Sequence, residues 1–155
     1  NGFDVHKFGL GDHVKLCGVK IPFSRGLLGH SDADVALHAL VDALLSGIDS
    51  GDIGQHFPSN EEKWRDRPSE DFLAYTMKLV SENGAKINHI DMTFICNEPR
   101  ISEFREAMRN KLSKIMGISK KRISLKGTTT DGLGFTGRGE GIAVQATVTM
   151  IVYNE

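Results

Sequence analysis

Cysteine is scarce in this sequence: the 155 residues include only two, Cys17 and Cys96, which lie far apart in apolar surroundings. This arrangement excludes a CxxC redox motif and a zinc cluster built from neighbouring thiolates. We expect both thiols to be small core or strand residues of a protein in a reducing compartment.

Long apolar runs and a strong net charge are also lacking. No run of about 18 apolar residues occurs, so the sequence predicts no transmembrane helix and no membrane partner. The formal net charge of −1 indicates no general attraction to nucleic acid or anionic lipid. With no visible secretory signal, we expect a bacterial cytoplasmic protein. A plastid-type organelle stays open as an alternative, because the chain begins inside an expected strand.

The composition is that of an ordinary globular chain, with 39% hydrophobic residues, and its length suits one domain over 1–155. The hydrophobic periodicity predicts three helices and about five strands, which are interleaved along the chain. The expected helices cover 31–45, 69–83 (with Ser69 as N-cap) and 101–116. The expected strands cover 1–8, 87–96, 123–126 and 142–152, together with 14–17 and 19–22, which form a hairpin or one bent edge strand. We therefore expect a two-layer α/β (α+β) domain, with a mixed sheet and helices packed on one face.

A polar stripe interrupts the apolar pattern of the first expected helix. Asp34, His38 and Asp42 are four residues apart, so in a helix they stack along one side. A solvated helix edge is one explanation, and a metal-ligating histidine with a carboxylate that orients its ring is the other. Ser31 is the expected N-cap, with Asp34 as a shortened capping box.

The first expected strand carries a second polar pair. Strand side chains alternate, so Asp4 and His6 share one face and Phe3 and Val5 the other. A carboxylate and an imidazole one pleat apart can bind a metal, although an isolated D-x-H motif usually has no such role.

Two glycine-rich segments are candidate binding loops. The first follows the helix and runs through Phe57 and Pro58 to the charged stretch 61–66, which we expect to be a surface loop with a binding role. The second, 127–141, has three consecutive threonines that could hold phosphate oxygens, and Asp131, which could hold a hard cation. It lacks the lysine of a Walker P-loop, and a glycine loop with threonines as turn residues is the other explanation.

Three motifs together point to a known family. They are Gly2-Phe3-Asp4-Val5-His6, the segment from Gly29-His30-Ser31-Asp32 through His38 to Asp42, and the segment from Thr128-Thr129-Thr130 through Gly132-Leu133-Gly134-Phe135-Thr136-Gly137-Arg138-Gly139-Glu140-Gly141. In this order and spacing the sequence closely resembles the 2-C-methyl-D-erythritol 2,4-cyclodiphosphate synthase family of the non-mevalonate isoprenoid pathway.

The resemblance implies an enzyme that is a homotrimer around a central cavity, with active sites between neighbouring subunits. Its reaction converts 4-diphosphocytidyl-2-C-methyl-D-erythritol 2-phosphate to the 2,4-cyclodiphosphate and CMP. The resemblance also implies Zn²⁺ on Asp4, His6 and His38, with a fourth position left open for a phosphate oxygen. A second cation, Mg²⁺ or Mn²⁺, would lie near Asp131, where the family commonly has glutamate.

The same resemblance implies the remaining site residues. His30 and Thr129 match residues that stabilise the transition state, and Ser31 and the Asp52-Ile53-Gly54 loop match contacts to the erythritol phosphate. The other matching substrate-binding positions are Phe57, Pro58, Cys96, Pro99, Arg100, Thr128, Thr130 and Asp131. Phe135, Arg138 and Glu140 match the lining of the central cavity, which can hold an isoprenoid diphosphate; packing of a trimer core is the alternative role for these three. We interpret Asp42 as a partner of the metal ligands or a buried polar residue.

Two other functions stay open. One is a zinc-dependent phosphodiesterase or other hydrolase that uses metal-bound water. The other is a non-catalytic trimer that binds isoprenoid diphosphates and uses the metal for structure only.

Overall fold

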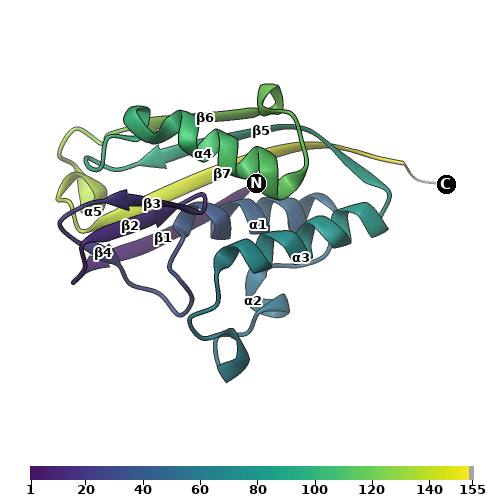
Figure 1. Cartoon of the computed structure of the whole chain (residues 1–155), viewed down its shortest axis with the longest axis horizontal. Coiled ribbons are helices and arrows are strands. Elements are labelled where there is room, and N and C mark those ends of the chain that lie inside the picture. The colour runs from purple at the N-terminus through teal and green to yellow at the C-terminus, as the bar shows by residue number, and fades with distance from the viewer. Residues whose placement is uncertain (154–155) are drawn as a thin grey trace.

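The alternating strands assemble into one five-stranded mixed sheet in the computed structural model, which describes residues 1–153 (Figure 1). Its strands are β1 (Gly2–Gly9), β4 (Gly26–Leu27), β5 (Ala85–Ile95), β6 (Ile123–Thr128) and β7 (Gly141–Val152). The spatial order is β4-β1-β7-β5-β6. β5 and β6 are parallel and the other neighbours are antiparallel, which confirms the predicted mixed sheet.

A separate hairpin is formed by β2 (His13–Leu16) and β3 (Val19–Pro22). The turn between them is made by Cys17 and Gly18, which both have positive φ. Both cysteines, Cys17 and Cys96, are free and buried, as the sequence predicts.

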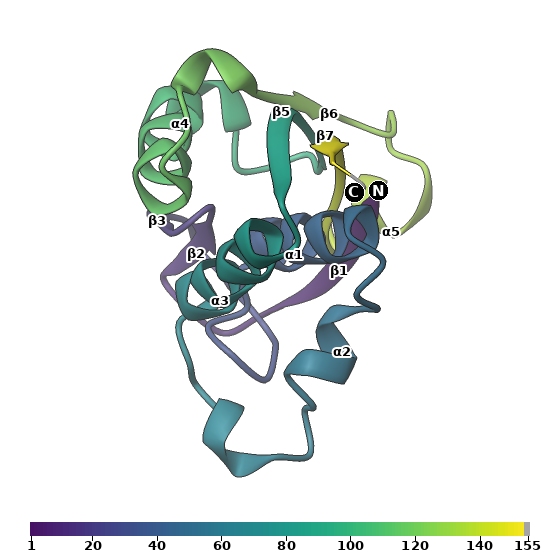
Figure 2. The same cartoon turned by 90° about the vertical axis from the view of Figure 1, so that its right-hand side faces the viewer.

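Helices cover one face of the main sheet. α1 (Val35–Gly47) and α3 (Ser69–Glu82) pack side by side, and α4 (Ile101–Met116) lies over β5 and β6 (Figures 1 and 2). The short helices are α2 (Ile53–His56), η1 (Glu62–Trp64), η2 (Lys120–Arg122) and α5 (Gly134–Gly137). Within residues 1–153, none of the helices has the length and apolar character needed to cross a bilayer.

α1 is the centre of the hydrophobic core and packs closely against β1. A Cβ atom on Gly2 would lie only 1.9 Å from the carbonyl oxygen of Ala39, so only glycine permits this approach. The backbone of α1 at Ala39 and Ala43 lies against the strand at this point. The close contact brings polar side chains of β1 within reach of those on α1.

The beginnings of two helices differ from the sequence prediction. α1 starts at Val35, and its N-cap is Asp34, whose carboxylate accepts from the backbone N–H of Leu37. Ser31 is therefore not the cap, because Ala33 has positive φ and cannot belong to the helix. Ser69 is the first residue of α3 and not its cap, which is Pro68.

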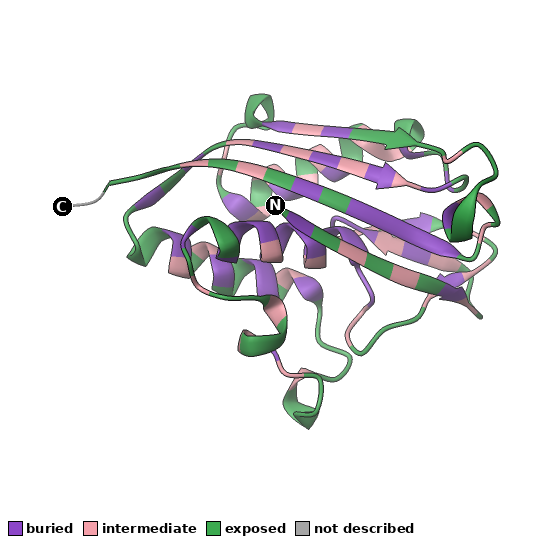
Figure 3. Cartoon of the chain, turned by 180° about the vertical axis from the view of Figure 1, so that it is seen from behind, coloured by how far each residue is buried: buried purple, intermediate pink, exposed green. Residues whose placement is uncertain are grey.

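The other face of the sheet is bare in this chain (Figure 3). Phe3 is 58% exposed and Val5 39%, while Gln145 and Thr147 beside them on β7 are also exposed. Phe3 and Val5 share this face, as predicted, and Asp4 and His6 share the helix-covered face. The bare face is thus partly apolar, and among residues 1–153 the short helix α5 lies near it at one end, beside Val5 and Lys7.

Candidate metal centre and active site

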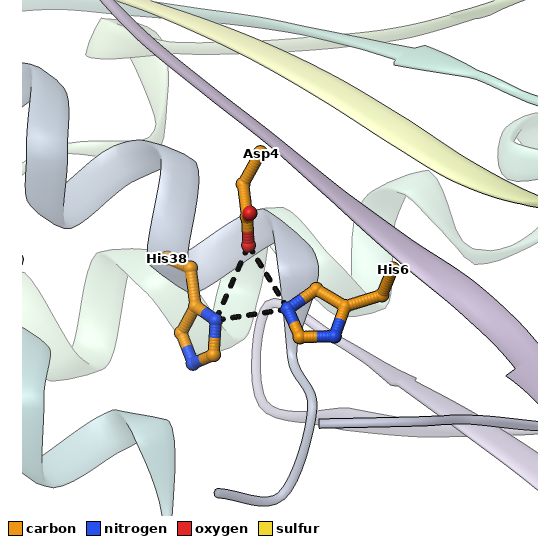
Figure 4. Close-up of side chains that lie close together, drawn as sticks. All are labelled: Asp4, His6 and His38. Atoms are coloured by element: carbon orange, nitrogen blue, oxygen red, sulfur yellow. Dashed lines mark hydrogen bonds and ion pairs between the residues drawn. The ribbon is translucent and has the colours of Figure 1, made fainter. Parts of the chain in front are cut away.

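Asp4 and His6 from β1 and His38 from α1 converge on one point (Figure 4). Asp4 Oδ2 lies 3.0 Å from His6 Nε2 and 3.2 Å from His38 Nδ1, and the two ring nitrogens are 3.1 Å apart. Among residues 1–153 this is the one group of three such side chains close enough to share a metal ion. The structure thus brings together the three metal ligands that the resemblance implies.

The chemistry of the three groups fits a divalent cation. Asp4 Oδ2 is buried and makes no hydrogen bond of good geometry, although two imidazole nitrogens lie beside it. Partial burial raises the pKa of Asp4, but the neighbouring imidazoles of His38 and His6 outweigh this effect and hold the pKa well below its usual range. Asp4 is therefore ionised, and one carboxylate with two imidazoles is a catalytic zinc ligand set that leaves a position open.

Neighbouring groups orient the two imidazoles. His6 Nδ1 lies 2.6 Å from the backbone oxygen of Leu28, so Nδ1 carries the proton and Nε2 is free for a cation. A Cβ atom on Gly29 would lie 2.6 Å from His6 Cε1, so the glycine leaves room for the ring. His38 Nε2 lies 3.0 Å from Ser31 Oγ and 2.9 Å from Ser69 Oγ, which leaves its Nδ1 facing Asp4.

A pocket of about 390 Å³ opens beside the cluster. His6 and His38 line it together with six further predicted site residues: His30, Ser31, Ile53, Gly54, Phe57 and Pro58. The side chain of Asp52 does not line the pocket but caps α2 by accepting from the N–H of Gln55. Most of the residues predicted to hold the erythritol phosphate therefore surround one cavity next to the metal ligands.

A second pocket, of about 340 Å³, lies at the carboxyl ends of β5 and β6. It is lined by Cys96, Pro99, Arg100, Thr128 and Thr129, all predicted as substrate-binding residues. These residues come together because β5 and β6 are parallel neighbours, with Ile95 opposite Thr128. The parallel pairing therefore brings these five candidate residues around one cavity.

The rest of the threonine–glycine loop does not line either of these pockets, although Asp131 is hydrogen-bonded to Thr129. Thr129 Oγ1 donates to Asp131 Oδ1 at 3.2 Å, and Thr130 Oγ1 donates to the backbone oxygen of Leu133. Phe135 contributes to a third cavity beside Val5, and Arg138 is ion-paired with Glu140 at 2.8 Å.

Within one chain the metal ligands and the threonine loop are not brought together. β6 is three places from β1 in the sheet, which corresponds to about 14 Å between strand axes. Val5 and Thr128 lie in one row across these strands, through Ala143 and Ile95. Along this row, a diphosphate is too short to contact both the metal ligands and the threonines of the same chain.

The two aspartates of the polar stripe, Asp34 at the N-cap of α1 and Asp42 within the helix, have roles that differ from that of His38. Asp34 is fully buried and accepts three backbone N–H groups, from Leu37 and from Cys17 and Gly18 of the hairpin turn. Burial raises its pKa to about 6, against the opposing effect of these hydrogen bonds. Asp42 accepts from the N–H of Ile53 at 2.7 Å and so positions α2; it makes no hydrogen bond to a metal ligand.

Sequence reasoning missed several residues around the site. Ser69 was expected only to cap a helix, and Phe72 was given no role at the site, yet Phe72 lines the pocket. Trp64, in the charged loop, also lines the pocket and stacks edge-on against Phe57. Asp32 and Lys15 form an ion pair of 2.7 Å next to Ser69. No local pattern marks these residues, since only the packing of separate elements brings them to the site.

Comparison with known proteins gives a consistent result. The model of the YgbB family matches residues 1–151. The 2-C-methyl-D-erythritol 2,4-cyclodiphosphate synthase of Roseobacter denitrificans is 53% identical over 151 residues, covering 97% of this chain and 95% of that protein. The bifunctional enzyme IspD/IspF of a Ruegeria species is 50% identical, but the match covers only 40% of its length.

A solved structure agrees with these matches. The CDP-bound form of a 2C-methyl-D-erythritol-2,4-cyclodiphosphate synthase superposes with a TM-score of 0.88 at 37% identity, covering 97% of each chain. Fold, site and sequence therefore agree over almost the whole length, and the chain belongs to the YgbB family.

Proposed function

We propose that this chain is a cyclodiphosphate synthase, a CMP-releasing lyase of non-mevalonate isoprenoid precursor biosynthesis. Its substrate is 4-diphosphocytidyl-2-C-methyl-D-erythritol 2-phosphate. An oxygen of the 2-phosphate bonds to the β-phosphorus, the bond from that phosphorus to the bridging oxygen breaks, and CMP leaves with that oxygen. The observation that carries the proposal is the Asp4, His6 and His38 cluster at the edge of a pocket, in a chain 53% identical to a curated synthase.

The chain's own residues provide positioning and charge stabilisation. The nucleophile is already an anionic phosphate, so the site needs no strong general base and must overcome repulsion and align the reacting oxygens. Zn²⁺ on Asp4, His6 and His38 would supply Lewis-acid polarisation of a phosphoryl oxygen. His30 and Thr129 donate to the developing charge, and Ser31 with Ile53 and Gly54 holds the erythritol phosphate.

The second pocket is the proposed nucleotide subsite. Cys96, Pro99, Arg100 and Thr128 surround it, and the family member with the 0.88 TM-score was solved with CDP. Thr130 and Asp131 complete this side of the site, where Mg²⁺ or Mn²⁺ would bind the diphosphate near Asp131. Asp131 stands where the family commonly has glutamate, so its carboxylate would extend one methylene less far toward this cation.

We also propose that the active enzyme is a homotrimer with each site shared between two chains. Two features support this assembly: the bare, partly apolar sheet face, and the separation of the metal ligands from Thr129 and Asp131 within one chain. Phe135, Arg138 and Glu140 would then lie around the three-fold axis, where an isoprenoid diphosphate can bind. The relatives named above that match this chain are bacterial, and we propose a cytoplasmic location.

Phosphorus NMR of the reaction tests the proposed activity. With the cytidyl substrate, zinc and magnesium, we expect CMP and a cyclic diphosphate without release of inorganic phosphate. Incorporation of oxygen from ¹⁸O-labelled water into the product would instead indicate a hydrolase. Binding of a prenyl diphosphate without any turnover at saturating metal would indicate a binding protein.

A further inference from the structure

The outer nitrogen of His38 has a defined environment. Nε2 points away from the proposed cation and lies 2.9 Å from Oγ of Ser69, the first residue of α3. Ser69 is fully buried, and its hydroxyl makes no helix-capping hydrogen bond. The hydroxyl of Ser69 therefore forms hydrogen bonds neither with solvent nor with the N–H groups at the start of α3.

The same hydroxyl contacts a carboxylate. Ser69 Oγ lies 2.5 Å from Asp32 Oδ1, and Lys15 Nζ donates to Asp32 Oδ2 at 2.7 Å. Asp32, as an ionised carboxylate, only accepts hydrogen bonds, so the single hydroxyl proton of Ser69 is directed to it. The lone pairs of Ser69 Oγ are then left to accept the N–H of His38 Nε2.

We propose that Ser69 is a positioning residue for metal binding, held in a chain that runs from His38 through Ser69 and Asp32 to Lys15. The chain places the proton of neutral His38 on Nε2 and leaves the Nδ1 lone pair for the cation. It joins four separate parts of the fold, because Lys15 is on β2, Asp32 precedes α1, His38 is on α1 and Ser69 is on α3. This inference rests on the proposed metal site.

Ser31 has a different role in this arrangement. Its hydroxyl lies 3.0 Å from the same ring nitrogen, but Ser31 lines the pocket and Ser69 does not. His38 protonated on Nε2 only donates at this nitrogen, so the hydroxyl proton of Ser31 is left for a phosphate oxygen in the pocket or for Ser69 Oγ, 3.3 Å away.

Ser69→Ala tests the proposal, with Ser31→Ala as the matched comparison. Zinc affinity is measured on the full chain by competition with a chromophoric chelator, and unfolding of the metal-free protein is followed in parallel. We expect Ser69→Ala to weaken zinc binding by about 10- to 100-fold, as loss of an outer partner does. Ser31→Ala should change zinc affinity by less than about threefold, because the Ser69 contact remains.

A second measurement does not depend on metal. Long-range proton–nitrogen NMR of metal-free protein reports which nitrogen of each histidine is protonated. Near pH 8 we expect His38 to be protonated on Nε2 in the unmodified chain, and to populate both tautomers in Ser69→Ala. A purely structural role would lower thermal stability and leave tautomer and zinc affinity unchanged.

Two results would overturn the inference: unchanged zinc affinity in Ser69→Ala, or an unmodified chain with the His38 proton on Nδ1. A larger loss of zinc affinity in Ser31→Ala than in Ser69→Ala would also overturn it, because Ser31 would then be the positioning residue. Failure of the unmodified chain to bind zinc at all is a different result, since it would contradict the proposed function itself.

Discussion

Among single residues, His38 connects the two halves of the metal cluster. It is the one ligand that α1 supplies, whereas Asp4 and His6 both come from β1. The sequence could predict Asp4 and His6 as a pair on one strand face, and His38 as part of a polar stripe. It could not predict by periodicity that the strand and the helix would meet at this point, because the contact depends on the close approach at Gly2.

Removing His38 should abolish tight metal binding without unfolding the protein. His38→Ala leaves two ligands, and we expect bound zinc to fall to about a tenth of the unmodified content or less. Elemental analysis after dialysis measures this, and circular dichroism checks the fold. His13→Ala is the control, because the His13 ring, on the hairpin, is hydrogen-bonded to Asp12 and is not one of the three clustered ligands. Full zinc content in His38→Ala would refute the ligand assignment.

Asp34 should make the stability of the protein depend on pH. Its pKa is raised to about 6 by burial, so the folded state binds a proton more tightly than the unfolded state. The stabilisation is complete below the unfolded pKa of about 4 and is lost as pH rises through about 6, by at most about 3 kcal/mol.

The Asp34→Asn variant isolates this effect. Its side chain does not titrate, so the decrease in unfolding free energy between about pH 4 and about pH 6.5 should be smaller than in the unmodified chain. The variant should also be less stable at low pH, because an amide N–H would face a backbone donor now bound by Asp34. Urea titrations at several pH values measure both quantities, and parallel pH profiles would contradict the predicted titration.

For helices and strands, the sequence predicted positions well where burial alone decides them. α4 runs from Ile101 to Met116, as expected, because its apolar residues recur at helical spacing and Gly117, in the left-handed conformation, ends the helix. The predicted start of α1 was wrong, because Ser31 and Asp34 are both suitable N-cap residues by sequence. Asp34 is the cap in the structure, where its carboxylate also accepts the N–H groups of the hairpin turn. The placement of α2 likewise depends on a contact with α1, through Asp42.

Asp42→Ala should loosen α2 without disturbing the metal cluster. The N–H of Ile53 would lose its carboxylate partner, and Ile53 and Gly54 line the pocket. We expect KM for the proposed substrate to rise by about 3- to 30-fold, in line with a charged hydrogen bond, while zinc content stays unchanged. Steady-state kinetics measures this, and Asp71→Ala, which removes a surface ion pair with Arg67, is the control. An unchanged KM would show that Asp42 does not position the pocket.

In the whole molecule, the bare sheet face and the divided site are the main observations. The alternation of β7 could predict that one of its faces is polar and short-chained, but not whether water or another subunit covers it. The resemblance supplies the trimer, and the described chain supplies the two features that a trimer would explain: exposed Phe3 and Val5, and distant groups of site residues.

A charge on the bare face should prevent assembly. Val5→Asp places a carboxylate in the proposed interface, and we expect native mass spectrometry to show monomers in place of trimers, with turnover reduced at least about 100-fold. Leu10→Asp is the matched control, since Leu10 is fully exposed in the bend that follows β1 and is not part of the sheet. A trimer that survives Val5→Asp would contradict the proposed interface.

Anomalous diffraction at the zinc edge, on crystals grown with zinc and CDP, tests the central claim most directly. The account predicts one strong peak within about 2.0–2.2 Å of Asp4 Oδ2, His6 Nε2 and His38 Nδ1, with the fourth position facing the pocket. A zinc peak elsewhere, or none among these three side chains, would contradict it.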